Sequence, residues 1–278
     1  MDVPTYELND GNLIPQIGLG TYSLNGYEGR DAVANAIRAG YRLIDTAFNY
    51  ENEGAVGAAI RSIGIPREQI FVTSKLPGRH HRYDLAVKSI EESIARLGLE
   101  YLDLHLIHWP NPKTGLYVEA WQALIDCQKR GLIRSIGVSN FLPEHLERII
   151  SETGVTPAVN QIQRHPYIPQ DAQLQFDAGL GIRTEAWSPL YRARGLETLP
   201  GMAALEEKYG KSAVQIVLRW HIQSGVIPIP KAANPVRQQA NLHVFDFELD
   251  AEDMAALGAN PDPAKTVVEG NPNTHEEM

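Results

Sequence analysis

The chain has almost no cysteine, no excess of basic residues and no long uninterrupted apolar segment. Its 278 residues include 1 cysteine, Cys127, which excludes an internal disulfide and lies in a helical pattern typical of a buried core position. The formal net charge of −9 disfavours nucleic acid as the main partner. No apolar run approaches the ~20 residues that span a bilayer, and residues 1–10 lack the apolar region of a signal peptide. We therefore expect a cytoplasmic protein without a membrane partner.

What the chain does contain is enough apolar material for one large core. Hydrophobic residues make up 43% and charged residues 21% of the sequence, which are ordinary globular values. We expect residues 1–278 to form one domain, because α/β barrels of roughly 250 residues are commonly undivided. Residues 260–278 are rich in Pro, Asn and Glu, and we expect either a disordered end or a flap.

Short apolar runs alternate with amphipathic stretches along the chain. A turn at 9–12 between apolar residues predicts an N-terminal β-hairpin. Eight strands are predicted at 17–19, 43–44, 70–74, 102–107, 133–138, 158–161, 181–185 and 226–229. Helices are predicted at 31–39, 53–63, 85–97, 118–129, 143–150, 170–178, 212–223 and 235–242, with an extra helix at 199–209. Strict alternation of eight such units predicts an α/β fold, a (β/α)8 TIM barrel with extra helices.

Several helix ends carry recognisable local signals. Gly40, Gly98, Gly131 and Gly179 each follow a helical pattern, which predicts left-handed backbone at the end of the helix. Ser212, three residues before a glutamine, predicts a capping box at the start of the helix at 212–223.

Four ionisable side chains come at or just after the predicted ends of strands. They are Asp45, Tyr50, Lys75 and His108. In a barrel of parallel strands these ends converge on one open face, where catalytic groups lie. Taken singly, each residue has a plain structural explanation: a packing tyrosine, a structural histidine, or a buried Asp–Lys ion pair. Together they predict a single site that handles protons.

The adjacent pair His80 and His81 is a weak candidate for a metal site. No carboxylate or cysteine accompanies the pair at the spacing that metal ligands require. We expect a solvated loop there and no bound metal.

Short motifs spread over nearly the whole chain resemble the aldo-keto reductase superfamily. Within it, the resemblance is to the prokaryotic branch that includes 2,5-diketo-D-gluconate reductases. The matching segments are 18–22, 40–47, 50–53, 102–110, 131–140, 157–161, 187–190, 217–220 and 229–231. Each segment is weak alone, but their order and their places at strand ends make the set specific.

The resemblance implies reduction of a small carbonyl substrate by NADPH. Tyr50 would be the general acid, Lys75 would ease loss of its proton, Asp45 would hold Lys75, and His108 would orient the carbonyl. Keto sugars, dicarbonyls and keto acids are the expected substrates. The family positions that wall the substrate pocket correspond here to Tyr22, Phe48 and Trp109. Asn49 would meet a hydroxylated substrate, and His108 would also contact the substrate.

The cofactor site would not be a Rossmann fold, because Ser23 stands where a third glycine would be required after Gly18 and Gly20. The resemblance implies NADPH contacts from Gly20, Thr21, Tyr22, Asp45, Ser139, Asn140, Gln161, Trp187, Ser188, Pro189, Leu190, Lys231, Asn234, Arg237 and Asn241. Ser139 and Asn140 have an alternative role as helix caps. Lys231 and Arg237 would bind the 2′-phosphate, aided by the start of the helix at 235–242.

Some positions depart from the family pattern. Ala232 and Ala240 replace polar residues near the adenosine half of the cofactor, so NADH is a possible weaker cofactor. Pro77 replaces a common tryptophan and predicts a wider substrate pocket. Arg192 and Arg194 would contact an anionic substrate, cover the pyrophosphate, or face water.

Two other classes of function compete with a reductase. One is a nucleotide-binding regulatory subunit of the same fold, which the complete set of four residues disfavours. The other is a metal-dependent hydrolase, which would need more His and Asp at strand ends than Asp45 and His108. We expect a monomer.

Overall fold

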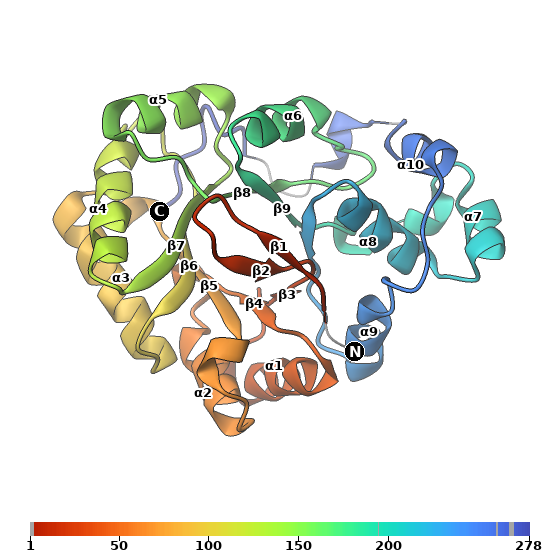
Figure 1. Cartoon of the computed structure of the whole chain (residues 1–278), viewed down its shortest axis with the longest axis horizontal. Helices are drawn as coiled ribbons and strands as arrows, with labels where there is room; N and C mark the ends of the chain where they lie inside the picture. The colour runs from red at the N-terminus through yellow and green to blue at the C-terminus, as the bar shows by residue number, and fades with distance from the viewer. Residues whose placement is uncertain (1–2, 194, 260, 267–269) are drawn as a thin grey trace.

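The computed structural model describes residues 3–193, 195–259, 261–266 and 270–278. Within these ranges an eight-stranded parallel sheet follows chain order from β3 to β10. Its strands are β3 Leu19–Gly20, β4 Leu43–Asp45, β5 Phe71–Leu76, β6 Leu102–Ile107, β7 Ile133–Ser139, β8 Val159–Gln163, β9 Arg183–Trp187 and β10 Ile227–Ile229. The helices surround the sheet (Figure 1).

Backbone contacts between its first and last strands close the sheet into a barrel. Gly20 pairs with Lys231 in a parallel bridge. The N–H groups of Gly18 and Gly20 donate to the carbonyls of Pro228 and Pro230 at 3.1 and 3.0 Å. A Cβ on Gly20 would lie 3.1 Å from the carbonyl oxygen of Ile229, so a glycine lets the two strands meet. The predicted (β/α)8 barrel is confirmed.

Each connection between consecutive strands contains at least one helix. The helices are α1 Gly26–Ala39, α2 Glu53–Ser62, α3 Tyr83–Leu97, α4 Tyr117–Lys129, α5 Pro143–Thr153, α6 Asp171–Gly179, α7 Met202–Tyr209 and α8 Ala213–Gln223, with α9 Pro235–Leu242 and α10 Ala251–Gly258 after the last strand. Helix α7 is the predicted extra helix. Helix α10 was not predicted from the sequence, although Asp250 caps its start by accepting from the N–H of Asp253.

The predicted helix caps are confirmed with one exception. Gly40, Gly98 and Gly131 have positive φ angles of 124°, 62° and 78°, and Ser212 forms the predicted capping box. The prediction for Gly179 is wrong. This residue is the last of helix α6, and the left-handed position falls two residues later at Gly181, with φ 71°.

Apolar side chains form separate layers inside and outside the barrel wall. The inner layer includes Leu43, Leu106 and Ile229, and the outer layer joins the strands to the helices. Cys127 is completely buried in the outer layer, as predicted. Leu8 and Ile14, from the predicted hairpin of β1 Thr5–Glu7 and β2 Leu13–Pro15, pack into the inner layer. The hairpin therefore plugs the end where the strands begin, which faces the viewer in Figure 1.

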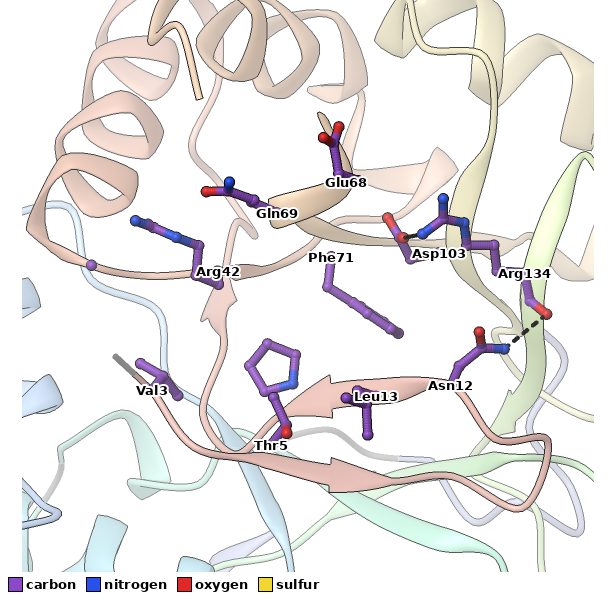
Figure 2. A pocket seen from close by; sticks show the side chains of 12 residues that line it. Val3, Thr5, Asn12, Leu13, Arg42, Glu68, Gln69, Phe71, Asp103 and Arg134 are labelled. Carbon is purple, nitrogen blue, oxygen red and sulfur yellow. Dashed lines mark hydrogen bonds and ion pairs between the residues drawn. The ribbon is translucent and has the colours of Figure 1, made fainter. Parts of the chain in front are cut away.

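A hollow of about 440 Å³ lies beside this hairpin (Figure 2). Its main buried charge is Asp103, which accepts hydrogen bonds from Arg67 at 2.7 Å and from the N–H of Val72 at 2.9 Å. Arg134 lies 3.5 Å from the same carboxylate. Burial raises the pKa of Asp103 more than these partners lower it. The strand ends with the predicted catalytic residues lie at the other end of the barrel.

Along the ranges that the structure describes, no helix combines the length and apolar character needed to cross a membrane.

Candidate active site

The four ionisable residues meet where strands β4, β5 and β6 end. Asp45 is the last residue of β4, and His108 directly follows β6. Lys75 Nζ donates to Asp45 Oδ1 at 2.7 Å and to the carbonyl of Thr46 at 2.9 Å. The same nitrogen lies 5.1 Å from the ring centroid of Tyr50, and the rings of Tyr50 and His108 are 5.9 Å apart. The structure thus gathers residues that are up to 63 positions apart (108 − 45) into one site.

The local fold explains why these side chains point the same way. Alternate residues of a strand face the barrel interior, and the parallel register pairs Asp45 with Thr73, two residues before Lys75. Tyr50 lies in a short 3-10 turn, Phe48–Tyr50, that begins three residues after β4 ends. This turn brings the phenol back over the strand ends.

Burial dominates the acidity of Tyr50. Its side chain is only partly buried as a whole, but the hydroxyl end lies in the enclosed part of the site. Burial raises the pKa of Tyr50 more than the charge of Lys75 lowers it, so the net shift is upward. Lys75 does lower the pKa of Tyr50, as expected, but burial raises it by more, so Tyr50 is not a stronger acid than a free phenol. Tyr50 holds its proton at neutral pH.

Lys75 is a buried cation stabilised by its neighbours. Burial lowers the pKa of Lys75, but the nearby carboxylate of Asp45 and the phenol of Tyr50 more than offset this effect, and the net shift is upward. With a side chain only 1% exposed, the ammonium remains charged because its partners replace the lost water.

A glutamine amide connects this cluster to a carboxyl group that the sequence reasoning missed. Gln161 Nε2 donates to Asp45 Oδ2 at 2.9 Å and to Glu185 Oε2 at 2.7 Å. Both amide hydrogens are therefore used inside the barrel. The side-chain oxygen of Gln161, Oε1, is the group of this amide that can meet a ligand.

Glu185 is completely buried inside the barrel. Burial and the negative charge of Asp45 raise its pKa to about 8, so Glu185 is mostly neutral at pH 7. The signal in the sequence was its position at the end of the strand predicted at 181–185, two residues before Trp187. In β9, which reaches Trp187, this spacing places both side chains on the same face.

Ser139, Asn140 and Trp187 form a hydrogen-bonded chain beside the cluster. Asn140 Nδ2 donates to the carbonyl of His108 and to Ser139 Oγ, both at 3.0 Å. Trp187 Nε1 donates to Asn140 Oδ1 at 2.9 Å. The alternative role of Ser139 and Asn140 as helix caps is wrong, because Leu142 is the N-cap of α5.

The residues predicted to wall the substrate pocket divide into two groups. Tyr22 is 61% exposed and packs edge-on against Tyr50, with centroids 5.2 Å apart. Trp109 is buried beside His275 of the C-terminal segment, with ring centroids 4.2 Å apart. Phe48 instead packs against Arg96 of helix α3, at 4.1 Å from its guanidinium carbon. Arg79 lies over the same ring at 5.4 Å, and the ring of His80 is 5.2 Å away, so Phe48 packs between helix α3 and the loop after β5.

The predicted adenosine-phosphate residues lie around the start of helix α9. Lys231 and Arg237 are exposed, whereas Asn241 is buried. Asn234 caps the helix, because its Oδ1 accepts from the N–H groups of Val236 at 2.9 Å and Arg237 at 3.2 Å. Since the cap already uses those N–H groups, binding of a phosphate here would depend on the two cationic side chains more than on the helix terminus.

The remaining predicted cofactor residues have structural contacts of their own. Thr21 Oγ1 donates to the carbonyl of Asp45 at 2.9 Å. Ser188 has a left-handed φ of 49°, which turns the chain sharply after β9. The carbonyl of Pro189 lies 3.1 Å from His221 Nε2, and Leu190 packs against the outer core.

The expectation of a solvated loop at His80 and His81 needs revision. His81 is 1% exposed rather than solvated, and burial lowers its pKa to about 4. In the described ranges, no three His, Cys, Asp or Glu side chains are placed to hold a metal ion. Arg192 is exposed, and Arg194 lies outside the residues that the structure describes.

Comparison with known proteins agrees with this geometry. Residues 16–259 match the aldo/keto reductase family, so the chain belongs to that family. It is 50% identical over 277 residues to 2,5-diketo-D-gluconic acid reductase B of Corynebacterium sp. (strain SHS752001), covering 100% of this chain and 99% of that protein.

Two further similarities bear on substrate and cofactor. Methylglyoxal reductase DkgA of Escherichia coli (strain K12) is 43% identical over 252 residues, covering 90% of this chain and 91% of that protein. A crystal structure of a Bombyx mori aldo-keto reductase in complex with NADP matches with a TM-score of 0.87 and 39% identity, covering 94% of each chain.

Proposed function

We propose that this aldo-keto reductase uses NADPH to reduce small aldehydes or ketones, such as keto sugars, dicarbonyls or keto acids, to alcohols. The observation that carries the proposal is the buried ion pair of Lys75 and Asp45 beside the phenol of Tyr50. Relatives named for a diketogluconate and for methylglyoxal support the class of substrate.

The protein side of the reaction is proton delivery. Bound NADPH supplies the hydride that goes to the carbonyl carbon. Tyr50, protonated at neutral pH, donates its proton to the carbonyl oxygen as negative charge develops there. The ammonium of Lys75 stabilises the phenolate that remains, and Asp45 fixes Lys75. His108 orients the carbonyl oxygen toward the phenol.

The residues around the barrel mouth fit an NADPH molecule. The side-chain oxygen Oε1 of Gln161 would accept from the amide N–H of nicotinamide, and Ser139 and Asn140 would add polar contacts. Trp187 provides an aromatic face for the ring. Gly20, Thr21, Tyr22 and residues 188–190 line the cofactor's path to Lys231, Asn234, Arg237 and Asn241, where the cations favour NADPH over NADH.

We also propose that residues 1–278 act as one domain, as a monomer in the cytoplasm. A regulatory, nucleotide-binding role without turnover would not require the ion pair beside Tyr50. Burying the charges of Lys75 and Asp45 is costly, and catalysis gives a reason for that cost. The described C-terminal residues contact the open face, as a flap would.

Replacing Tyr50 by Phe tests the proton donor. The substitution removes only the hydroxyl, and we expect kcat for NADPH-dependent methylglyoxal reduction to fall by about 10²–10⁴-fold, the usual contribution of a positioned acid. NADPH affinity, measured by quenching of tryptophan fluorescence, should change little.

Tyr27→Phe is the matched control, because Tyr27 is 80% exposed on helix α1. It should retain wild-type turnover. Normal activity in Tyr50→Phe would show that another group supplies the proton. Absence of NADPH oxidation by the wild-type protein with every aldehyde and ketone offered would overturn the proposed function itself.

A further inference from the structure

A carboxylate from the C-terminal segment lies beside His108 at the candidate active site. Glu277 Oε1 is 2.7 Å from His108 Nδ1, a distance that suits an ion pair although the ring N–H does not point straight at the oxygen. The same oxygen accepts from Asn49 Nδ2 at 2.8 Å. Glu277 Oε2 accepts from the N–H of Gly78 at 3.1 Å. The carboxylate of Glu277 thus contacts His108, Asn49 and Gly78 at the same time.

The backbone around Glu277 is held by the loop after β6. Asn111 Nδ2 donates to the carbonyl of Glu277 at 2.8 Å, and the N–H of Glu277 donates back to Asn111 Oδ1 at 3.0 Å. Glu276 accepts from the N–H of Lys113 at 2.7 Å and from Thr114 Oγ1 at 2.6 Å. Together with the tilted packing of His275 against Trp109, these contacts fix the carboxylate beside His108.

The carboxylate of Glu277 is negatively charged at neutral pH. Burial alone raises its pKa, but the charge of His108 and the hydrogen bonds from Asn49 and Gly78 outweigh burial, and the net pKa is lowered. Its side chain is only 12% exposed, so solvent screens the charge weakly. Arg79, a cation at the rim, donates to Asn49 Oδ1 and to the main-chain oxygen of Met278.

We propose that Glu277 is a specificity-determining residue: its resident carboxylate favours neutral aldehydes and ketones and, among the keto acids proposed above as substrates, disfavours those that carry the carboxylate on the reacting carbonyl. Two reasons support the inference, which rests on the proposed function. A carbonyl placed between Tyr50 and His108 would bring such a carboxylate within a few ångströms of Glu277. The donors that could receive it, Asn49 and the N–H of Gly78, are already engaged.

Pyruvate and methyl pyruvate form a matched pair of substrates, because they share the ketone and differ in the charge next to it. We expect wild-type kcat/KM to favour the ester. In Glu277→Gln, which keeps the size and an acceptor oxygen, the ester-to-acid ratio should fall on the order of 10- to 100-fold, as removal of one close, weakly screened negative charge predicts. Glu277→Asp, which retains the charge, should keep a ratio nearer to that of the wild type.

Glu147→Gln controls for loss of one acidic residue, because Glu147 is exposed on helix α5; its ratio should match the wild type. Loosening of the C-terminal segment alone would slow or speed both substrates together and leave the ratio unchanged. An unchanged ratio in Glu277→Gln, or a wild-type preference for pyruvate, would overturn the proposal. If the wild type reduces neither compound nor methylglyoxal, the proposed function fails instead, so the two failures are distinguishable.

Discussion

Replacement of Glu185 by Gln should stabilise the protein, and more so as the pH rises. The burial of Glu185 raises its pKa from 4.5 to about 8. Between these values the folded protein binds a proton at Glu185 and the unfolded chain does not, so wild-type stability falls as the pH rises toward 8. The substituted glutamine carries no titratable group, yet its oxygen can still accept from Gln161.

The size of the effect follows from proton linkage. A difference of one pKa unit corresponds to ~1.4 kcal/mol, so the wild type should lose roughly 3 kcal/mol relative to Glu185→Gln between about pH 5.5 and pH 8. Lys75 and Asp45, which face Glu185, and other buried titratable groups such as Asp177 are common to both proteins. The difference between the two proteins therefore isolates Glu185.

Urea unfolding followed by tryptophan fluorescence across this pH range measures the difference. Glu147→Gln, which removes an exposed acid, should run parallel to the wild type at every pH. A difference between Glu185→Gln and the wild type that stays constant with pH would mean that Glu185 is ionised in the folded protein throughout. The reasoning about its burial would then be wrong.

The other predictions concern cofactor choice and helix packing. Arg237→Ala should raise the KM for NADPH about 10-fold or more while changing that for NADH little, because a cation beside the 2′-phosphate is lost; steady-state kinetics with both cofactors would refute the role if the two constants rise equally. Gly57→Ala should destabilise the fold by about 2–3 kcal/mol in urea unfolding, since its Cβ would come within 1.8 Å of the carbonyl oxygen of Leu97 on α3. Gly54→Ala in the same helix is the control, because its Cβ would be 3.9 Å from the closest backbone oxygen; equal losses in the two variants would contradict the steric explanation.

Much of the fold was predictable because its signals are local. Apolar runs of strand length, amphipathic helical stretches and glycines such as Gly98 report on their own segments, and their alternation predicts the barrel. Helix α10 was missed because it is short, and its cap residue Asp250 lies among other acids. Gly179 was misassigned because a glycine after a helical pattern does not reveal whether it ends the helix or belongs to its last turn.

The candidate site was predictable to the extent that its residues sit at strand ends. The barrel brings Asp45, Lys75 and His108 together because they end neighbouring parallel strands. The direction of the pKa of Tyr50 was not predictable in this way. It depends on how burial balances the charge of Lys75, and burial is a property of the folded protein.

The amino-acid sequence by itself determined the order of strands and helices, the closed barrel and the identity of the groups at its mouth, since these follow from periodicity and from where polar residues interrupt apolar runs. Only the tertiary structure decided that Glu185 and Asp45 both accept hydrogen bonds from the side-chain amide of Gln161. It also decided that Glu277 contacts His108, 169 positions away (277 − 108). Contacts between residues so far apart arise from packing of the whole chain, and no short stretch of sequence encodes them.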